Sequence, residues 1–189
     1  MNAPWFSPTG VLDPAKHARF IANRANLAKD AGIPEHLLWK PLPALTAGEK
    51  TWLAKFRQHR NTGYCGLLLT GAEPAIDPLS RIGAMAGCLS RNFVRARVFS
   101  LLDALTILSE GGEIVATCLL IPDFVADKKN DKQMPAWRVQ QLTALLTDRW
   151  SGTNLQTVVY ATSLDAVGKE YGSYVRDLLK KHYVEVKVA

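Results

Sequence analysis

The segment after residue 70 is the first candidate for chemistry, because an apolar run ends there in Gly71 and a helix is expected to follow. A phosphate-binding loop at such a place has the pattern G-x-x-x-x-G-K-[ST]. Its glycines admit phosphate to backbone N–H groups, its lysine neutralises charge and its hydroxyl holds magnesium. Counted from Gly71, this chain has Ile76 for the second glycine, Asp77 for the lysine and Pro78 for the hydroxyl. Aspartate repels phosphate and proline supplies no N–H, so we expect no nucleotide cofactor and no ATP hydrolysis.

Two later apolar runs also end in residues that could meet a phosphate or a metal ion. Asp123 follows the run at 118–122, and Thr162 and Ser163 follow the run at 158–161. Asp123 is a candidate metal ligand, but without the lysine and the hydroxyl we favour a strand-end carboxylate that binds nearby backbone N–H groups. Thr162 and Ser163 either contact a γ-phosphate or cap the helix that follows, and we favour the cap.

Two clusters of basic residues are candidates for contact with nucleic acid, because cations follow a phosphate backbone and an aromatic ring can stack on a base. For the first cluster we favour a solvated loop in which Trp137 packs as an anchor at the start of a helix. For the second, a solvated edge is at least as good an interpretation. The basic members are Lys128, Lys129, Lys132 and Arg138 in the first cluster, and Arg91, Arg95 and Arg97 in the second.

Residues for other kinds of catalysis are not arranged in any recognisable pattern. There is no G-x-S-x-G and no G-x-G-x-x-G sequence. The histidines are scattered, and none are spaced as a metal pair on one helix face. The cysteines lie in apolar contexts, and an odd number without a C-x-x-C pair argues for a reducing compartment and against a zinc site. We therefore expect no catalytic residues and no metal ligands, and cysteines that are inert in the core. These residues are His17, His36, His59 and His182, and Cys65, Cys88 and Cys118.

Helical and strand patterns alternate along the chain, which predicts an α/β fold with a mostly parallel five-stranded sheet. A helix begins at Asp13-Pro14 and ends before Gly32, and a Thr46/Glu49 capping box begins the next one. The expected helices span about 13–31, 46–60, 79–90, 102–110, 137–150 and 164–182, and the expected strands 64–70, 96–101, part of 113–122, 157–162 and 184–188.

The composition fits one globular domain with a short extension. The chain has 189 residues, of which 48% are hydrophobic and 21% charged, and its net charge is +6. We predict a lead-in with one helix at 1–31 and an α/β domain at 32–189. No apolar run reaches the roughly 20 residues that span a bilayer, and no secretory signal is visible, so we expect a cytoplasmic protein. The positive charge favours acidic partners, nucleic acid first among them.

The order of these elements from about residue 32 to 188 resembles the AAA+ ATPase core of bacterial helicase loaders of the DnaC type and of transposition ATPases of the IstB type. The resemblance implies a P-loop-type sheet flanked by helices. It makes Asp123 the counterpart of the family's Walker B aspartate, with Phe124 where an acid normally polarises water. It makes 158–163 similar to a sensor strand, and Arg176 the nearest match to an arginine that reaches the neighbouring subunit's nucleotide. The segments that carry the resemblance are 32–71, 119–123 and 174–188.

The resemblance and the altered phosphate-binding pattern together suggest a pseudo-ATPase, a non-hydrolysing accessory protein of a phage or other mobile element. Its expected partners are a replicative helicase, an AAA+ protein or DNA, in replication or transposition, with no membrane contact and with homo-oligomers left open. One alternative is an inhibitor or decoy that caps a host AAA+ ring. Another is a sequence-independent DNA-binding module, and a weak nucleotide-using enzyme is a further one.

Overall fold

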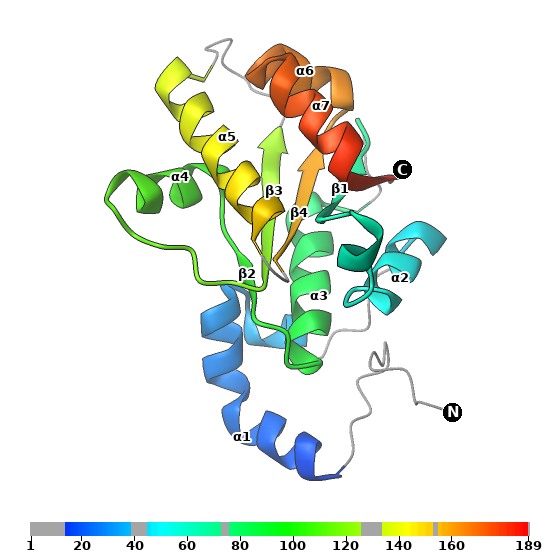
Figure 1. Ribbon diagram of the computed structural model, residues 1–189. Helices are drawn as coiled ribbons and strands as arrows, with labels where there is room; N and C mark the ends of the chain where they lie inside the picture. The colour runs from blue at the N-terminus through cyan, green and yellow to red at the C-terminus, as the bar shows by residue number, and fades with distance from the viewer. Residues whose placement is uncertain (1–13, 39–44, 73–75, 126–133, 153–154, 189) are drawn as a thin grey trace.

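A five-stranded, wholly parallel sheet forms the centre of the molecule (Figure 1). The computed structural model describes residues 14–38, 45–72, 76–125, 134–152 and 155–188. The strands lie in the order β2-β3-β4-β1-β5, so that Leu68 of β1 pairs with Val159 of β4 and with Glu185 of β5. The prediction of an α/β fold with a parallel five-stranded sheet is confirmed. The strands are β1 Gly66–Thr70, β2 Ala96–Val98, β3 Cys118–Val125, β4 Gln156–Ala161 and β5 Tyr183–Lys187.

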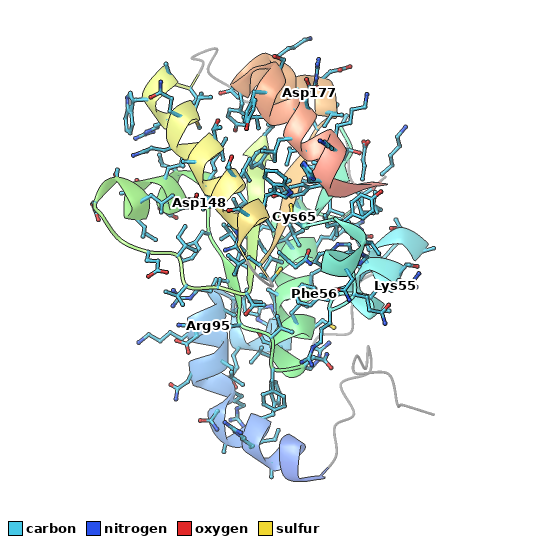
Figure 2. All side chains as sticks on the ribbon, in the orientation of Figure 1. Lys55, Phe56, Cys65, Arg95, Asp148 and Asp177 are labelled. Atoms are coloured by element: carbon cyan, nitrogen blue, oxygen red, sulfur yellow. The ribbon has the colours of Figure 1, made fainter. Side chains whose placement is uncertain are left out.

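Helices cover both faces of the sheet, because successive side chains of a buried strand point to opposite faces and both sets are apolar. Leu67 and Leu69 of β1 belong to one core with α1, α2 and α3, whereas Leu68 belongs to a second core with α4 to α7. Figure 2 labels Phe56, which belongs to the first core, and Cys65, which belongs to the second. The helices are α1 Pro14–Ala31, α2 Ala47–Ala54, α3 Pro78–Arg91, α4 Leu101–Ser109, α5 Ala136–Ser151, α6 Leu164–Tyr171 and α7 Ser173–His182, with short 3-10 helices at Glu35–Leu38 (η1) and His59–Thr62 (η2).

The capping box at the start of α2 is confirmed. Thr46 Oγ1 accepts the Glu49 N–H at 3.3 Å, and Glu49 Oε2 accepts the Thr46 N–H at 2.8 Å. The predicted end of this helix is wrong, because α2 stops at Ala54 and the chain then turns. Packing explains the turn: Phe56 meets Trp52 edge to face at 5.3 Å, and His59 stacks on the same ring at 5.7 Å.

Other predicted boundaries also differ from the structure. The strand predicted at 96–101 ends at Val98, because Ser100 caps α4 and Leu101 is the first residue of that helix. The expected helix at 164–182 is two helices, because Gly172 adopts a φ of 89° between them, a conformation that glycine reaches without a steric penalty. The third strand begins only at Cys118 and continues through Pro122 and Asp123 to Val125, with a register shift against β4. Asp123 is therefore held inside the last part of β3.

The amino-terminal helix α1 packs against η1, α3 and β2. Phe20, Ala28 and Ala31 are buried in the first core, while the opposite side of the helix is exposed. In Figure 1 this helix (blue) lies below the sheet, at the far end of α3. Within the described residues, no helix is long and apolar enough to cross a membrane.

Candidate functional site

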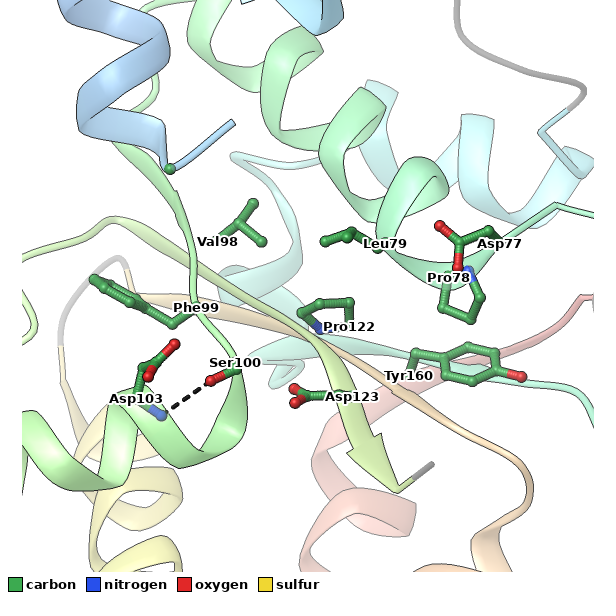
Figure 3. Close-up of a pocket in the computed structure, with 11 residues that line it drawn as sticks. Asp77, Pro78, Leu79, Val98, Phe99, Ser100, Asp103, Pro122, Asp123 and Tyr160 are labelled. Carbon is green, nitrogen blue, oxygen red and sulfur yellow. Dashed lines mark hydrogen bonds between the residues drawn. The ribbon is translucent and has the colours of Figure 1, made fainter. Parts of the chain in front are cut away.

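A pocket of about 520 Å³ lies at the carboxyl ends of the central strands, the place where open α/β sheets commonly bind ligands. It is bounded by the first turns of α3 and α4, by the segment that joins β2 to α4, and by the end of β3 (Figure 3). Much of its wall is apolar and is formed by Leu79, Val98, Phe99 and Pro122.

Three carboxylic acids from three different elements also line this pocket. Asp77 precedes α3, Asp103 lies in the first turn of α4, and Asp123 lies near the end of β3. Among the described lining residues there is no lysine, arginine or histidine. The pocket therefore presents negative charge to a ligand, which disfavours a triphosphate.

The three altered positions of the phosphate-binding pattern, Ile76, Asp77 and Pro78, lie at the start of α3. Asp77 is the N-cap residue, and its Oδ2 accepts the Ser80 N–H at 2.9 Å. Pro78 occupies the first helical position, and Ile76 is half-buried just before it. The chain thus places its own carboxylate at the helix N-terminus, where a bound phosphate would otherwise meet the N–H groups.

Gly71 directly follows β1, and backbone atoms of neighbouring segments lie close to it. Its N–H bonds to the Ala161 carbonyl, and its own carbonyl accepts the Tyr160 hydroxyl. A Cβ at this position would come within 2.0 Å of the Val188 carbonyl oxygen. The glycine is therefore required by the close approach of β5, whatever the loop after it binds.

Asp123 joins the end of β3 to the start of α4. Its Oδ1 accepts the Leu101 N–H at 2.8 Å, so the favoured interpretation of a strand-end carboxylate that binds a backbone N–H is confirmed. Burial raises the pKa of Asp123, the Leu101 N–H lowers it, and the nearby Asp103 carboxylate raises it further. Across the described residues, no three metal-type side chains are grouped closely enough to hold a metal ion.

The other predicted nucleotide contacts lie outside the lining of this pocket. Ser163 Oγ accepts the Ala166 N–H at 3.0 Å and caps α6, as the favoured interpretation has it, and Thr162 is half-buried beside it. Arg176 lies over Gly168 and pairs with the adjacent Asp177, whose Oδ1 is 2.9 Å from the guanidinium.

The predicted basic cluster of Arg91, Arg95 and Arg97 does not form one surface. Arg91 is only 3% exposed and donates to the Leu38 carbonyl, so its assignment to a nucleic-acid patch is wrong. Its place on the buried side of α3 is the physical reason. Arg95 is exposed at the edge of the sheet, on the side of α1 (Figure 2). Arg97 donates to the Asp30 carbonyl at 3.0 Å.

The predicted cluster around Trp137 lies only partly within the described residues, since Lys128, Lys129 and Lys132 fall outside them. Trp137 is 51% exposed, with the Arg138 guanidinium 5.0 Å from its ring centre. A ring this exposed does not pack as the helix anchor that the sequence analysis favoured.

Buried cysteines agree with the prediction of inert core residues. Cys65, Cys88 and Cys118 are all buried, and none of them forms a disulfide. Burial raises the pKa of Cys88 to about 11 and that of Cys118 to about 12, so both are thiols at neutral pH.

The sequence analysis missed one feature of the site and one buried arginine outside it. The first is the start of α4, where Ser100 Oγ accepts the Asp103 N–H at 3.0 Å; the S-x-x-D pattern at 100–103 is the signal that could have located it. The second is Arg149, which is 4% exposed and donates to Thr157 Oγ1 and to the Ala116 and Gln156 carbonyls. Nothing in the sequence distinguishes this buried arginine from a surface arginine on an amphipathic helix.

Comparison with known proteins identifies the fold. No family model matches the chain, and no curated protein matches it. Among solved structures, DnaI superposes with a TM-score of 0.59 at 12% identity, over 83% of this chain and 95% of that one. A Streptococcus pyogenes serotype M3 protein described as a primosome component gives 0.60 at 14%, over 88% and 96%. The DnaC helicase loader gives 0.53 at 13%, over 77% and 92%. At such identities the match shows the fold alone, and that fold is the one that DnaI and the DnaC helicase loader have.

Proposed function

We propose that this chain is a helicase-loader-like accessory protein that works by binding and does not hydrolyse ATP. Its partner is a replicative helicase or another AAA+ protein during replication. The fold supports the class of partner, because one of the similar structures is a helicase loader and another is described as a primosome component. A shared fold does not carry a shared activity, so the site must decide the question of hydrolysis.

The observation that carries the proposal is the carboxylate of Asp77 at the start of α3. A helix N-terminus attracts phosphate through its N–H groups and its partial positive charge. Here the Asp77 carboxylate accepts the Ser80 N–H, which is then not available to a phosphate, and Pro78 has no N–H. Asp103 and Asp123 add negative charge to the adjoining pocket. A nucleotide would therefore bind against three carboxylates.

Thermal unfolding with Mg-ATP tests this absence of nucleotide binding. A ligand present at 100 times its Kd stabilises the native state by about 2.7 kcal/mol, which raises the Tm of a chain of this size by roughly 5–10 °C. We expect no rise for the wild type. The matched variant is Asp77→Asn, which keeps an N-cap acceptor and removes the charge. A wild-type rise that becomes larger in Asp77→Asn would place ATP at α3 and contradict the proposal.

Binding to the replicative helicase of the same genome tests the partner. The purified helicase and the tagged chain should co-purify after nuclease treatment. Loss of the complex on nuclease treatment would favour the DNA-binding alternative. The ATPase rate of an intact loader then separates the two protein-binding functions, since an accessory factor leaves it unchanged or raises it and a decoy lowers it.

A further inference from the structure

The pocket between α3, α4 and β3 combines an apolar wall with carboxylates. Figure 3 shows the Asp103 and Asp123 side chains on either side of Ser100, and Asp77 at the opposite end beside Pro78. Pro122 lies between these two ends, and Phe99 lies at the end where Asp103 is. At about 520 Å³ the pocket has the size of ordinary ligand sites. A ligand that fits must offer apolar surface together with positive charge.

The charge of this pocket contrasts with the charge of the chain. The whole protein carries +6, whereas the described lining residues contain three aspartates and no cation. Burial raises the pKa of Asp123, and the Asp103 carboxylate raises it further, so the two negative charges repel each other. A cation placed between them removes this repulsion and gains charge-assisted hydrogen bonds.

A free metal ion and a nucleotide both fit these observations poorly. In the part of the chain that the structure describes, no three carboxylate, histidine or cysteine side chains lie close enough together to coordinate a metal. A nucleotide would bring its phosphates to the acidic end of the pocket. An arginine side chain fits better, because its methylene stem packs on apolar walls and its planar guanidinium has five N–H donors and is weakly hydrated.

Within the part of the chain that the structure describes, no cation of the protein itself lines the pocket. Arg97 lies beside one of the lining residues, with its guanidinium 5.8 Å from the centre of the Phe99 ring. It does not line the pocket, however, and its Nε donates to the Asp30 carbonyl at 3.0 Å.

We propose that this pocket binds an arginine side chain that a partner protein presents, with Asp103 and Asp123 as the principal acceptors. The inference rests on the proposed function in one respect, namely that the partner is a protein and the site holds no nucleotide. Exposed Leu79 and Leu102, on the first turns of α3 and α4, provide apolar surface for the residues that flank the arginine.

An NMR titration of the full chain with Nα-acetyl-arginine methylamide tests the proposal at low salt. We expect saturable shifts at a Kd on the order of a few millimolar, as suits a single side chain. The diagnostic signals are the Leu101 and Ser80 amides, because these N–H groups bond to Asp123 and Asp77. The matched probe is the citrulline analogue, which is neutral and nearly isosteric, and it should shift neither signal at the same ionic strength.

Two aspartate-to-asparagine variants test whether the negative charge that binds the arginine lies in the pocket. Asp103→Asn should weaken arginine binding at least threefold, because it removes the negative charge of one of the two principal acceptors. The variant should still fold, because the side chain is exposed and the bond to Ser100 uses the backbone N–H of Asp103. Asp148→Asn, an exposed position on α5 (Figure 2), is the control and should bind as the wild type does. An otherwise unchanged spectrum establishes that each variant is folded.

Each outcome of the titration decides the inference. Absence of saturation by about 50 mM, or equal shifts with citrulline, overturns it and leaves the proposed function standing. Shifts of the same amides by Mg-ATP at micromolar concentration overturn both. Equal weakening by Asp103→Asn and Asp148→Asn also overturns it, since the effect would then be one of net charge.

Discussion

At the scale of single residues, Asp123 shows how one carboxylate serves two elements. It lies in β3 and accepts the first N–H of α4, so it fixes where that helix begins relative to the sheet. A negative charge at a helix N-terminus is favourable. Burial opposes it, however, and the net result is a pKa above the usual value of an aspartate.

Replacing Asp123 by asparagine should therefore change stability in a pH-dependent way. A raised pKa in the folded state means that the contribution of Asp123 is complete below its unfolded pKa of about 3.9 and is lost as the pH rises through the folded pKa. Asp123→Asn keeps the acceptor for Leu101 and lacks the charge. Its unfolding free energy should equal that of the wild type near pH 3.5 and exceed it at pH 7, measured by urea denaturation.

Asp123→Ala is the matched control for this measurement. It removes the acceptor as well as the charge and should cost about 1 kcal/mol at low pH, since the Leu101 N–H loses its partner. If Asp123→Asn is instead less stable than the wild type at pH 7, the charge at the start of α4 outweighs its desolvation and the argument fails.

What the sequence predicts at this scale depends on whether a residue acts locally. Ser163 bonds to an N–H three residues further on, and capping rules predict such a contact. For Asp123 the strand-end rule predicts a bond to a backbone N–H, but it does not predict that the partner is Leu101, 22 residues earlier in the chain. Arg91 and Arg149 are buried against carbonyls distant in sequence. Their burial depends on which helix face meets the sheet, and an arginine at that face gives no sign of it.

At the scale of elements, α3 lies unusually close to η1. A Cβ on Gly87 would come within 2.3 Å of the Leu37 carbonyl oxygen and 3.3 Å of Leu38 Cα. Both are backbone atoms, which cannot move without shifting η1. A Cβ on Gly83, one turn earlier in α3, would meet the tip of the Leu37 side chain at 2.7 Å and Ile33 Cγ2 at an ordinary 3.9 Å, and both are side-chain atoms.

These two glycines give a matched pair of substitutions. Gly87→Ala should destabilise the protein by roughly 2 kcal/mol or more, because overpacking outweighs the gain of about 1 kcal/mol in helix propensity. Gly83→Ala should cost less than about 1 kcal/mol, because the Leu37 side chain can change rotamer. Urea denaturation measures both, and equal costs would show that η1 yields as easily as a side chain.

Element types were easier to predict than element ends. The Thr46/Glu49 box fixes the start of α2, because both partners lie in the same turn. The end of α2 and the break at Gly172 depend on packing and on one positive φ, which periodicity does not reveal. The acidic pocket was not predicted either, since its aspartates come from α3, α4 and β3 and meet only in the folded chain.

At the scale of the whole molecule, alternation of strands and helices was enough to predict a parallel sheet, since a strand that returns parallel needs a crossover. The order β2-β3-β4-β1-β5 was not predicted, because it depends on pairings between residues far apart in sequence, such as Leu68 with Val159. The agreement with three solved structures at 12–14% identity shows that this arrangement forms with almost entirely different side chains.

Whether α1 unfolds together with the sheet or separately can be tested at the same scale. The sequence analysis divided the chain into 1–31 and 32–189, yet Phe20 of α1 is only 1% exposed and belongs to the core that includes α3 and the sheet. Phe20→Ala should cost about 3–5 kcal/mol. Far-UV circular dichroism and tryptophan fluorescence should still report one coincident urea transition, because α1 and the sheet then unfold together.

The neighbouring Ile21 is the control, since it is 36% exposed on the same turn of α1. Ile21→Ala should cost less than about 1 kcal/mol, because it removes little buried surface and alanine favours a helix. Comparable small losses for both variants, or two separate transitions, would mean that α1 docks weakly. The division at residue 31 would then be a true boundary of cooperative folding, and α1 would be available to a partner without unfolding the sheet.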